Sequence, residues 1–313
     1  MTLYALRRLA VALPILVAVT FCVFALVDLA PGDPAAAIAG ENPTPERINE
    51  IRVMLGLDEP LLTRYVSWFT AAVQADLGSS LANGQSVTEV IGDRLPVTIS
   101  LVFVAMLITL VVGLAAGMLA ALRHGRPTDR VITALASGAI ALPPFWVALV
   151  LVLLFSVNLG WFPSIGYEPL SAGLWPWLSH LLLPAIALSL LPMAEVTMQF
   201  RQALATVLKL DYITNAEARG LSRPRVLGKH AAKNAAVPVT TVFAYRFAQV
   251  LGGTVAIESV FDLPGIGRLA VNSVLSRDIP VLLGLVALTT LIVLVINLLV
   301  DISYGYFNPK VRT

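Results

Sequence analysis

Long apolar runs separated by short polar segments dominate the chain. A membrane-spanning helix needs about 20 consecutive, mostly apolar residues to cross the hydrocarbon core. Six segments meet this requirement: Leu9–Leu29, Val97–Leu122, Val131–Leu159, Leu181–Phe200, Val237–Ser259 and Val281–Tyr304. The pattern predicts an all-α polytopic membrane protein with six transmembrane helices. The first run is too long for the core of a typical secretory signal, so we expect it to be retained as a span.

The positive charges between the runs predict the direction of each span. With the N-terminus in the cytoplasm, the cytoplasmic segments hold Arg7 and Arg8, three arginines at 123–130, the basic run 201–233, and Lys310 with Arg312. The opposite side holds six arginines, four of them in one long loop. Cytoplasmic loops carry an excess of Lys and Arg. We therefore expect both termini in the cytoplasm of a bacterial cell, and a long extracytoplasmic loop after the first helix.

This topology predicts three regions, namely a first transmembrane helix (1–29), an extracytoplasmic loop subdomain (30–96) and a core of five spans (97–313). Composition agrees, since 58% of the residues are hydrophobic and 13% are charged, against about a quarter charged in soluble domains. The net charge of +2 does not suggest a nucleic-acid partner. The single cysteine, Cys22, excludes a disulfide framework and a cysteine metal cluster.

The basic segment between spans four and five has an internal organisation that a topology signal alone does not require. We expect Asp211 to cap a helix over Tyr212–Arg219 that stops at Gly220. Ser222 is then expected to cap a second helix, with Pro224 in its first turn. Five cations accompany these breaks: Arg219, Arg223, Arg225, Lys229 and Lys233. The pattern predicts a helix–glycine–helix knob that inserts into a partner.

The long outer loop and two charged residues within spans supply further candidates. Pro31, Gly32 and Asp33 predict a turn, and helical patterns follow from Thr44 to Gly56 and from Leu61 to Gly78. The loop is either a cap packed on its own spans or a docking surface for an external solute-binding protein, and both readings stay open. The turn at Glu258–Gly267, with Pro264 and Gly265, has a similar claim.

An unpaired charge at mid-membrane costs about 2.5–3.5 kcal/mol on insertion scales. Glu195 and Arg246, in predicted spans four and five, therefore either face the bundle interior or include one residue that reaches an interface. His124 and His180 are expected at interfaces or in solvent rather than in a metal site. Pro143-Pro144 predicts a kink in span three.

Several motifs resemble those of the ATP-binding-cassette importer permeases of the dipeptide, oligopeptide and nickel family. The basic segment resembles their ATPase-docking loop through Asp211-Tyr212-Ile213, Ala216 to Leu221, Lys229-His230-Ala231, Asn234-Ala235 and Pro238. Other fragments follow in the family's order: LAPGDPA (29–35), DLGSS (76–80), RLPVTISL (94–101), LGWFPSIG (159–166), ESVFDLPGIGRL (258–269) and NLLVDISYGYFNPKVR (297–312). The segment departs from the family pattern at Asn215 and Glu217 and lacks a Glu-Ala-Ala triplet.

The resemblance implies the first permease subunit of an importer, and it implies roles for particular residues. The coupling helix that contacts the ATPase would use Asp211, Tyr212, Ala216, Ala218, Arg219, Gly220, Leu221, Arg223 and His230. Extracytoplasmic docking or gating would use Pro31, Gly32, Asp33, Glu258, Pro264, Gly265 and Gly267, and the translocation path would use Glu195 and Arg246.

The implied partners are a second permease, one or two cytoplasmic ATPases and an extracytoplasmic binding protein. ATP and Mg²⁺ would bind to the ATPases, because this chain lacks a phosphate-binding Gly-x4-Gly-Lys-Ser/Thr motif; Gly228-Lys229 is followed by His230.

Peptides are the expected cargo, since a pathway with few fixed charges tolerates varied side chains, and nickel is the alternative. A self-contained secondary transporter would instead show matching halves with broken helices. A membrane enzyme would need paired catalytic groups. Neither pattern is evident in the sequence.

Overall fold

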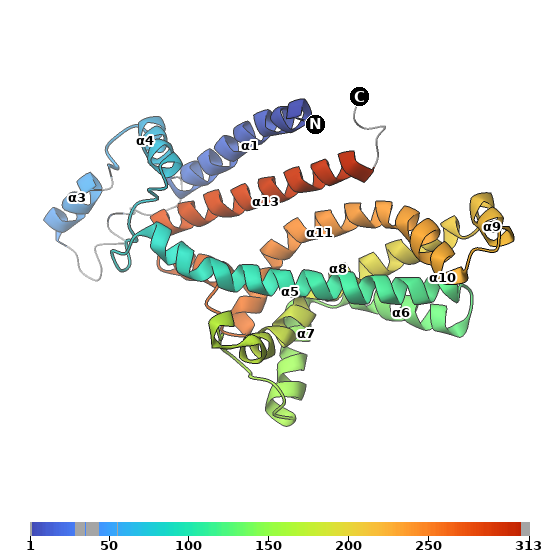
Figure 1. The fold of residues 1–313 in the computed structure, drawn as a ribbon. Coiled ribbons are helices and arrows are strands. Elements are labelled where there is room, and N and C mark those ends of the chain that lie inside the picture. Colours follow the sequence, from blue (N-terminus) through green and yellow to red (C-terminus); the bar gives the residue numbers. More distant parts are fainter. Residues whose placement is uncertain (1, 29–34, 36–43, 55, 308–313) are drawn as a thin grey trace. The chain divides into compact units, whose positions relative to one another are not determined.

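The computed structural model describes residues 2–28, 35, 44–54 and 56–307, and over these residues the fold is helical (Figure 1). Three helical segments are long and apolar enough to cross a membrane: Val87–Leu122, Leu174–Val207 and Ile279–Leu298. A bent helix pair raises the number of candidate spans to four. The all-helical membrane class is confirmed, whereas the count of six spans stays a prediction.

The chain divides into two compact units, residues 1–96 with 264–298 and residues 97–263 with 299–313. The first unit contains α1 (Thr2–Asp28), α3 (Pro45–Met54) and α4 (Leu61–Val73), the start of α5 (Val87–Leu122), α12 (Ile266–Leu275) and most of α13 (Ile279–Phe307). Helix α12 was not expected from the sequence.

Helix α4 packs on α1 through an aromatic cluster. Tyr65 lies edge-on against Phe21 and Phe24, with ring centroids 5.1 and 5.7 Å away. Its hydroxyl lies 2.9 Å from Thr20 Oγ1 and donates to the Val17 carbonyl at 3.0 Å. The side chain is buried, so its hydroxyl is satisfied internally. This part of the outer loop therefore forms a cap on its own first helix, as one of the two readings of the loop expected.

A buried carboxylate fastens the DLGSS segment in the same unit. Asp278, 4% exposed, accepts hydrogen bonds from the Ser80 hydroxyl and, at 3.1 Å, from the Leu81 backbone N–H. Two donors compensate the loss of hydration of this carboxylate. The segment is thereby held at the start of α13.

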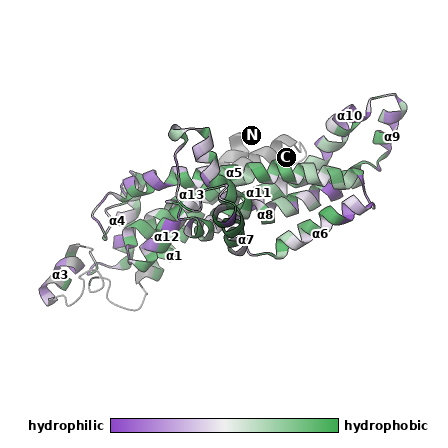
Figure 2. Ribbon diagram, turned by 90° about the horizontal axis from the view of Figure 1, so that it is seen from below, coloured by the Kyte–Doolittle hydropathy of each residue, from purple (hydrophilic) through white to green (hydrophobic). Residues whose placement is uncertain are grey.

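The second unit contains the rest of α5, then α6 (Pro127–Ala141), α7 (Pro144–Leu151), a π-helix (Val152–Asn158), a short 3₁₀ turn (Leu170–Ala172) and α8 (Leu174–Val207). It continues through α9 (Asp211–Ala218), α10 (Arg223–Arg225), a second π-helix (Val226–Ala232) and α11 (Lys233–Val260). Predicted spans two and four lie within α5 and α8, and span five lies within α11. Figure 2 shows hydrophilic residues along α9 and α10, in contrast to the largely hydrophobic α5.

The expected kink in span three is a full break. The helix direction bends by 105° between α6 and the segment Pro144–Asn158. Two successive prolines, Pro143 and Pro144, cannot donate backbone hydrogen bonds, and each disfavours helical geometry in the residue before it. The bend therefore falls at the two prolines where the kink was predicted, and the region consists of two helical segments rather than one bent helix.

Helices α5 and α8 approach each other closely at two glycines. A Cβ atom added at Gly113 would lie 2.9 Å from Val196 Cγ1, and one added at Gly117 would lie 2.7 Å from the Thr197 carbonyl oxygen. Small residues four apart on a helix allow such backbone contact between membrane helices.

Candidate functional site

The predicted knob is present over residues 211–232, which we call the 211–232 knob. Helix α9 ends at Ala218, and Gly220 takes a left-handed φ of 75°. The Gly220 N–H donates to the Glu217 carbonyl at 2.9 Å, and the Leu221 N–H donates to the Ala216 carbonyl at 3.3 Å. These two bonds form a Schellman motif, which glycine at this position favours. The predicted stop at Gly220 is confirmed.

Both helix starts differ in detail from expectation. Asp211 is the first residue of α9, with Leu210 at the N-cap, and no side chain caps the helix. The expected Asp211 cap is wrong, although its carboxylate still lies in the first turn, where the helix dipole favours negative charge. Ser222 is the N-cap of α10 through its backbone only, and Pro224 lies in the first turn as expected. The second helix then continues through the π-helix into α11 without a break.

The knob is fastened to the ends of α8 and α11 by an apolar cluster. Ile213 and Val226, 2% and 1% exposed, pack with Phe200 and Leu204 of α8. Ala216 joins the same cluster and is buried. Its methyl group thus packs against the chain's own core, and its part in contacting the ATPase stays a prediction.

Polar contacts add to this attachment. Asn234 of α11 donates to the Tyr212 hydroxyl at 2.8 Å and to the His230 carbonyl at 3.1 Å. The Tyr212 hydroxyl in turn donates to the His230 carbonyl at 3.4 Å. The predicted residues Tyr212 and His230 thus meet, and their role in the structure is to join α9 to the following helix.

The remaining predicted coupling residues lie at the surface. Ala218, Arg219, Gly220 and Arg223 are exposed, and Leu221 is partly exposed. A Cβ atom added at Gly220 would meet nothing within 4 Å. The knob therefore presents cations and small residues outward while its apolar residues face α8, an arrangement suited to insertion into a cleft with acidic or carbonyl groups.

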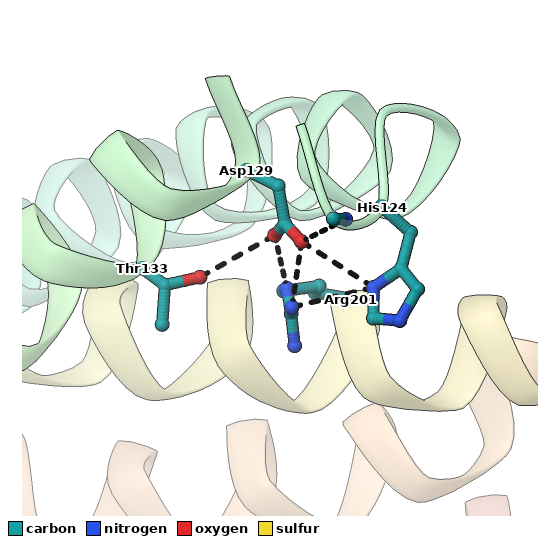
Figure 3. Close-up of polar contacts among 5 residues, drawn as sticks. His124, Asp129, Thr133 and Arg201 are labelled. Carbon is teal, nitrogen blue, oxygen red and sulfur yellow. Dashed lines mark hydrogen bonds and ion pairs between the residues drawn. The ribbon is translucent and has the colours of Figure 1, made fainter. Parts of the chain in front are cut away.

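A buried ion pair joins α6 to α8 in the same unit (Figure 3). Asp129 is 2% exposed and accepts hydrogen bonds from both Nε and Nη2 of Arg201, the second at 2.7 Å. The Gly125 N–H donates to Asp129 Oδ2 at 2.9 Å, and His124 Nδ1 lies 3.3 Å from the same oxygen. A bidentate arginine contact of this kind fixes the relative position of two helices. Sequence reasoning missed Asp129; an acidic residue among arginines in a short loop was the available signal.

The charges predicted within spans four and five meet each other. Arg246 donates through Nε and Nη2 to the two carboxylate oxygens of Glu195, and through Nη1 to Gln249 Oε1. The Glu195 and Arg246 side chains are 24% and 17% exposed. The sequence left the pairing of these two residues undecided, and the structure shows that they form an ion pair. The role of the pair in translocation stays a prediction.

The predicted docking residues fall into three situations. Pro31, Gly32 and Asp33 lie outside the described residues. Glu258 is fully buried in its unit and accepts a hydrogen bond from Thr98 Oγ1 at 2.5 Å. Its carboxylate is therefore not exposed for docking in this structure. Pro264 and Gly265 precede α12, and Gly267 is its second residue; Gly265 and Gly267 are buried. Their part in docking stays a prediction.

His124 and His180 both lie in the second unit, and each makes a polar contact. His124 has a half-exposed side chain beside Asp129, and His180 Nδ1 lies 2.8 Å from the Pro176 carbonyl. Over the described part of the chain, no group of three or more His, Cys, Asp or Glu residues is arranged to hold a metal ion.

Comparison with known proteins covers almost the whole chain. Residues 113–313 match the family described as binding-protein-dependent transport system inner membrane component, and residues 1–102 match its N-terminal family. A putative peptide transport system permease protein of Brucella abortus (strain 2308) is 42% identical over 312 residues, covering 100% of this chain and 99% of the relative. The oligopeptide transport system permease protein AppB of Bacillus subtilis (strain 168) is 35% identical and is covered completely.

Among solved structures, the inward-facing MetNI methionine ABC transporter is similar in fold. Its TM-score is 0.58 at 15% identity, and the match covers 70% of this chain and 96% of the other. At this identity the likeness concerns the fold alone.

Proposed function

The chain belongs to the family of binding-protein-dependent transport system inner membrane components, and from this premise we propose that it carries peptides across the bacterial cytoplasmic membrane. It is a multi-pass permease subunit rather than an enzyme. Full-length relatives at 35–42% identity are named for peptide and oligopeptide transport, which supports peptide cargo. ATP hydrolysis, with bound ATP and Mg²⁺, is assigned to separate ATPase subunits.

The observation that carries the proposal is the construction of the 211–232 knob. Its outer face carries cationic and small side chains, and its inner face packs on α8. Its second helix continues into α11. A cleft that closes around the knob would displace both helices together. An importer of this kind has two discrete states, and nucleotide binding by the partner favours one of them.

The remaining features complete the proposed assembly. The chain crosses the membrane six times with both termini in the cytoplasm, as the distribution of Lys and Arg indicates. It pairs with a second permease subunit and with one or two ATPases. An extracytoplasmic binding protein delivers cargo to the loop after the first helix, where Pro31, Gly32, Asp33 and the 258–267 segment are the proposed contacts.

Uptake in cells tests the proposal. Deletion of this chain should abolish uptake of labelled dipeptides and longer peptides, whereas uptake of labelled nickel should continue. If only nickel uptake is lost, nickel is the cargo instead of peptides. Coupling is tested by an Ala218→Cys variant in a Cys22→Ser background, crosslinked to a cysteine on the ATPase. Transport should stop on crosslinking and return on reduction. Transport by this purified chain without any partner would refute the proposal.

A further inference from the structure

One face of α11 differs in composition from the exposed surface of α5. On α5, within the same unit, the exposed side chains are large and apolar, among them Ile99, Phe103 and Leu107. On α11 the exposed positions recur every three or four residues and are polar or small: Thr241, Tyr245, Gln249, Gly252, Ala256 and Ser259. This spacing places them on one face of the helix. The polarity of this face does not suit contact with hydrocarbon.

The composition of the whole helix agrees. Helix α11 is 28 residues long, yet it is not among the helices apolar enough to count as candidate spans. A helix at membrane depth with a polar face is covered by protein or lines a water-filled cavity, because hydrocarbon offers its polar groups no partner. The α11 face therefore borders either a subunit or an aqueous path.

The Glu195–Arg246 pair lies against this face. Arg246 Nη1 donates to Gln249, and the Arg246 guanidinium carbon lies 5.6 Å from the centre of the Tyr245 ring. Tyr245 is 60% exposed, although it neighbours a partly buried ion pair. The result is a compact group in which two opposite charges, an amide and a phenol hydroxyl lie together and remain partly accessible.

This group matches the part of a peptide that does not depend on sequence. Every peptide presents main-chain N–H and C=O groups, and an unblocked peptide also has an ammonium and a carboxylate. Gln249 and Tyr245 can each donate and accept hydrogen bonds, and the ion pair offers a carboxylate and a guanidinium. Together with the proposed function, on which this step rests, these contacts lead us to propose that Tyr245 and Gln249, backed by Glu195 and Arg246, bind the peptide main chain during translocation.

A second permease subunit packed on the same face is the competing occupant, and chemical accessibility separates the two. The chain has one native cysteine, so Cys22→Ser provides a cysteine-free background. Tyr245→Cys and Gln249→Cys would be introduced singly, with Phe103→Cys on the apolar face of α5 as the matched control. The fully assembled importer would be treated with a membrane-impermeant, charged methanethiosulfonate reagent.

We expect both α11 cysteines to react, the Phe103→Cys control to stay unreactive, and saturating tripeptide with binding protein and ATP to slow the α11 reactions. Failure of both α11 cysteines to react in every nucleotide state would overturn the inference in favour of a subunit interface. Reaction that tripeptide does not affect would overturn it as well.

Transport by conservative variants gives the second measurement. Gln249→Leu and Tyr245→Phe should lower tripeptide transport by about tenfold, the scale of one or two lost ligand hydrogen bonds, while co-purification of all subunits is unchanged. Wild-type transport by both variants, or loss of the second permease from the complex, overturns the inference and leaves the proposed function intact. Absence of peptide transport by the wild-type assembly would instead overturn the proposed function itself.

Discussion

Replacing Gly117 by alanine tests how tightly α5 and α8 are packed. The new Cβ would lie 2.7 Å from the Thr197 carbonyl oxygen, with Phe200 Cβ at 3.2 Å. The nearest atom belongs to a helix backbone and cannot rotate aside, so one helix must move by several tenths of an ångström. Such overpacking costs about 1–3 kcal/mol.

A control on the same helix removes the effect of helix propensity. Alanine is favoured over glycine in a helix by about 1 kcal/mol wherever it is placed, and a Cβ at Gly92 would meet nothing within 4 Å. Relative to Gly92→Ala, Gly117→Ala should therefore be less stable by about the overpacking cost alone, roughly 1–3 kcal/mol. Gly113→Ala should fall between them, because its nearest contact at 2.9 Å is the end of the Val196 side chain.

The assay is reversible denaturation of the purified protein in detergent micelles, with the free energy of unfolding compared among the three variants and the wild type. Equal stability of Gly117→Ala and Gly92→Ala would show that the two helices have room to separate, and the close approach would then not constrain the fold.

Three further predictions concern the ion pair, the outer segment and the knob. Arg201→Met should destabilise by about 3 kcal/mol, because it leaves Asp129 buried without its charge partner; Asp129→Asn should cost less, since Arg201 is 24% exposed and can reach water. Ser80→Ala should cost about 1–3 kcal/mol in the same unfolding assay, because it removes a donor from the buried Asp278. Arg219→Glu should lower ATP-dependent uptake by about tenfold, as expected for an interface arginine worth more than 1 kcal/mol.

Each of these has its own control. If Asp129→Asn lowers the free energy of unfolding more than Arg201→Met does, then Arg201 rather than Asp129 is the member of the pair that depends more on its charge partner. Ser67→Ala, at an exposed position on α4, should change the free energy of unfolding by less than about 0.5 kcal/mol. If Ser80→Ala changes it no more than Ser67→Ala does, the hydrogen bond from Ser80 to Asp278 does not anchor the segment. Arg130→Glu changes an exposed arginine outside the knob, so equal loss of uptake in that variant would show a general charge effect.

Local patterns predicted the helices well where one physical cause dominates. The apolar runs located α5, α8 and α13, because hydrocarbon thickness sets the required length. Gly220 located the end of α9, because a left-handed residue at that position favours glycine. The runs did not reveal that α5 begins ten residues earlier, at Val87, since hydrophobicity marks the lipid-exposed length and not the helix end.

Contacts between distant residues were the part that the sequence could not supply. Asp129 and Arg201 are 72 residues apart, and Glu195 and Arg246 are 51 apart. Each residue alone is compatible with an interfacial position, and only the packing of the helices decides its partner. The expected Asp211 cap failed for a related reason, since the position of the helix start depends on how Ile213 is held by the core. Gly113 and Gly117 stand four residues apart in the sequence, but no contact between α5 and α8 was predicted from this spacing.

Helix α8 explains why a force on the knob need not be dissipated locally. Thr197 contacts the α5 glycine through its backbone, Arg201 binds the α6 carboxylate, and Glu195 binds α11. Phe200 and Leu204, between and beyond these positions, hold the knob. Four different neighbours are thus fastened within three turns of one helix, by backbone contact, two ion pairs and apolar burial. Close-packed interiors transmit displacement rather than absorb it. A closing cleft around the knob would therefore move α8 with its neighbours as one body.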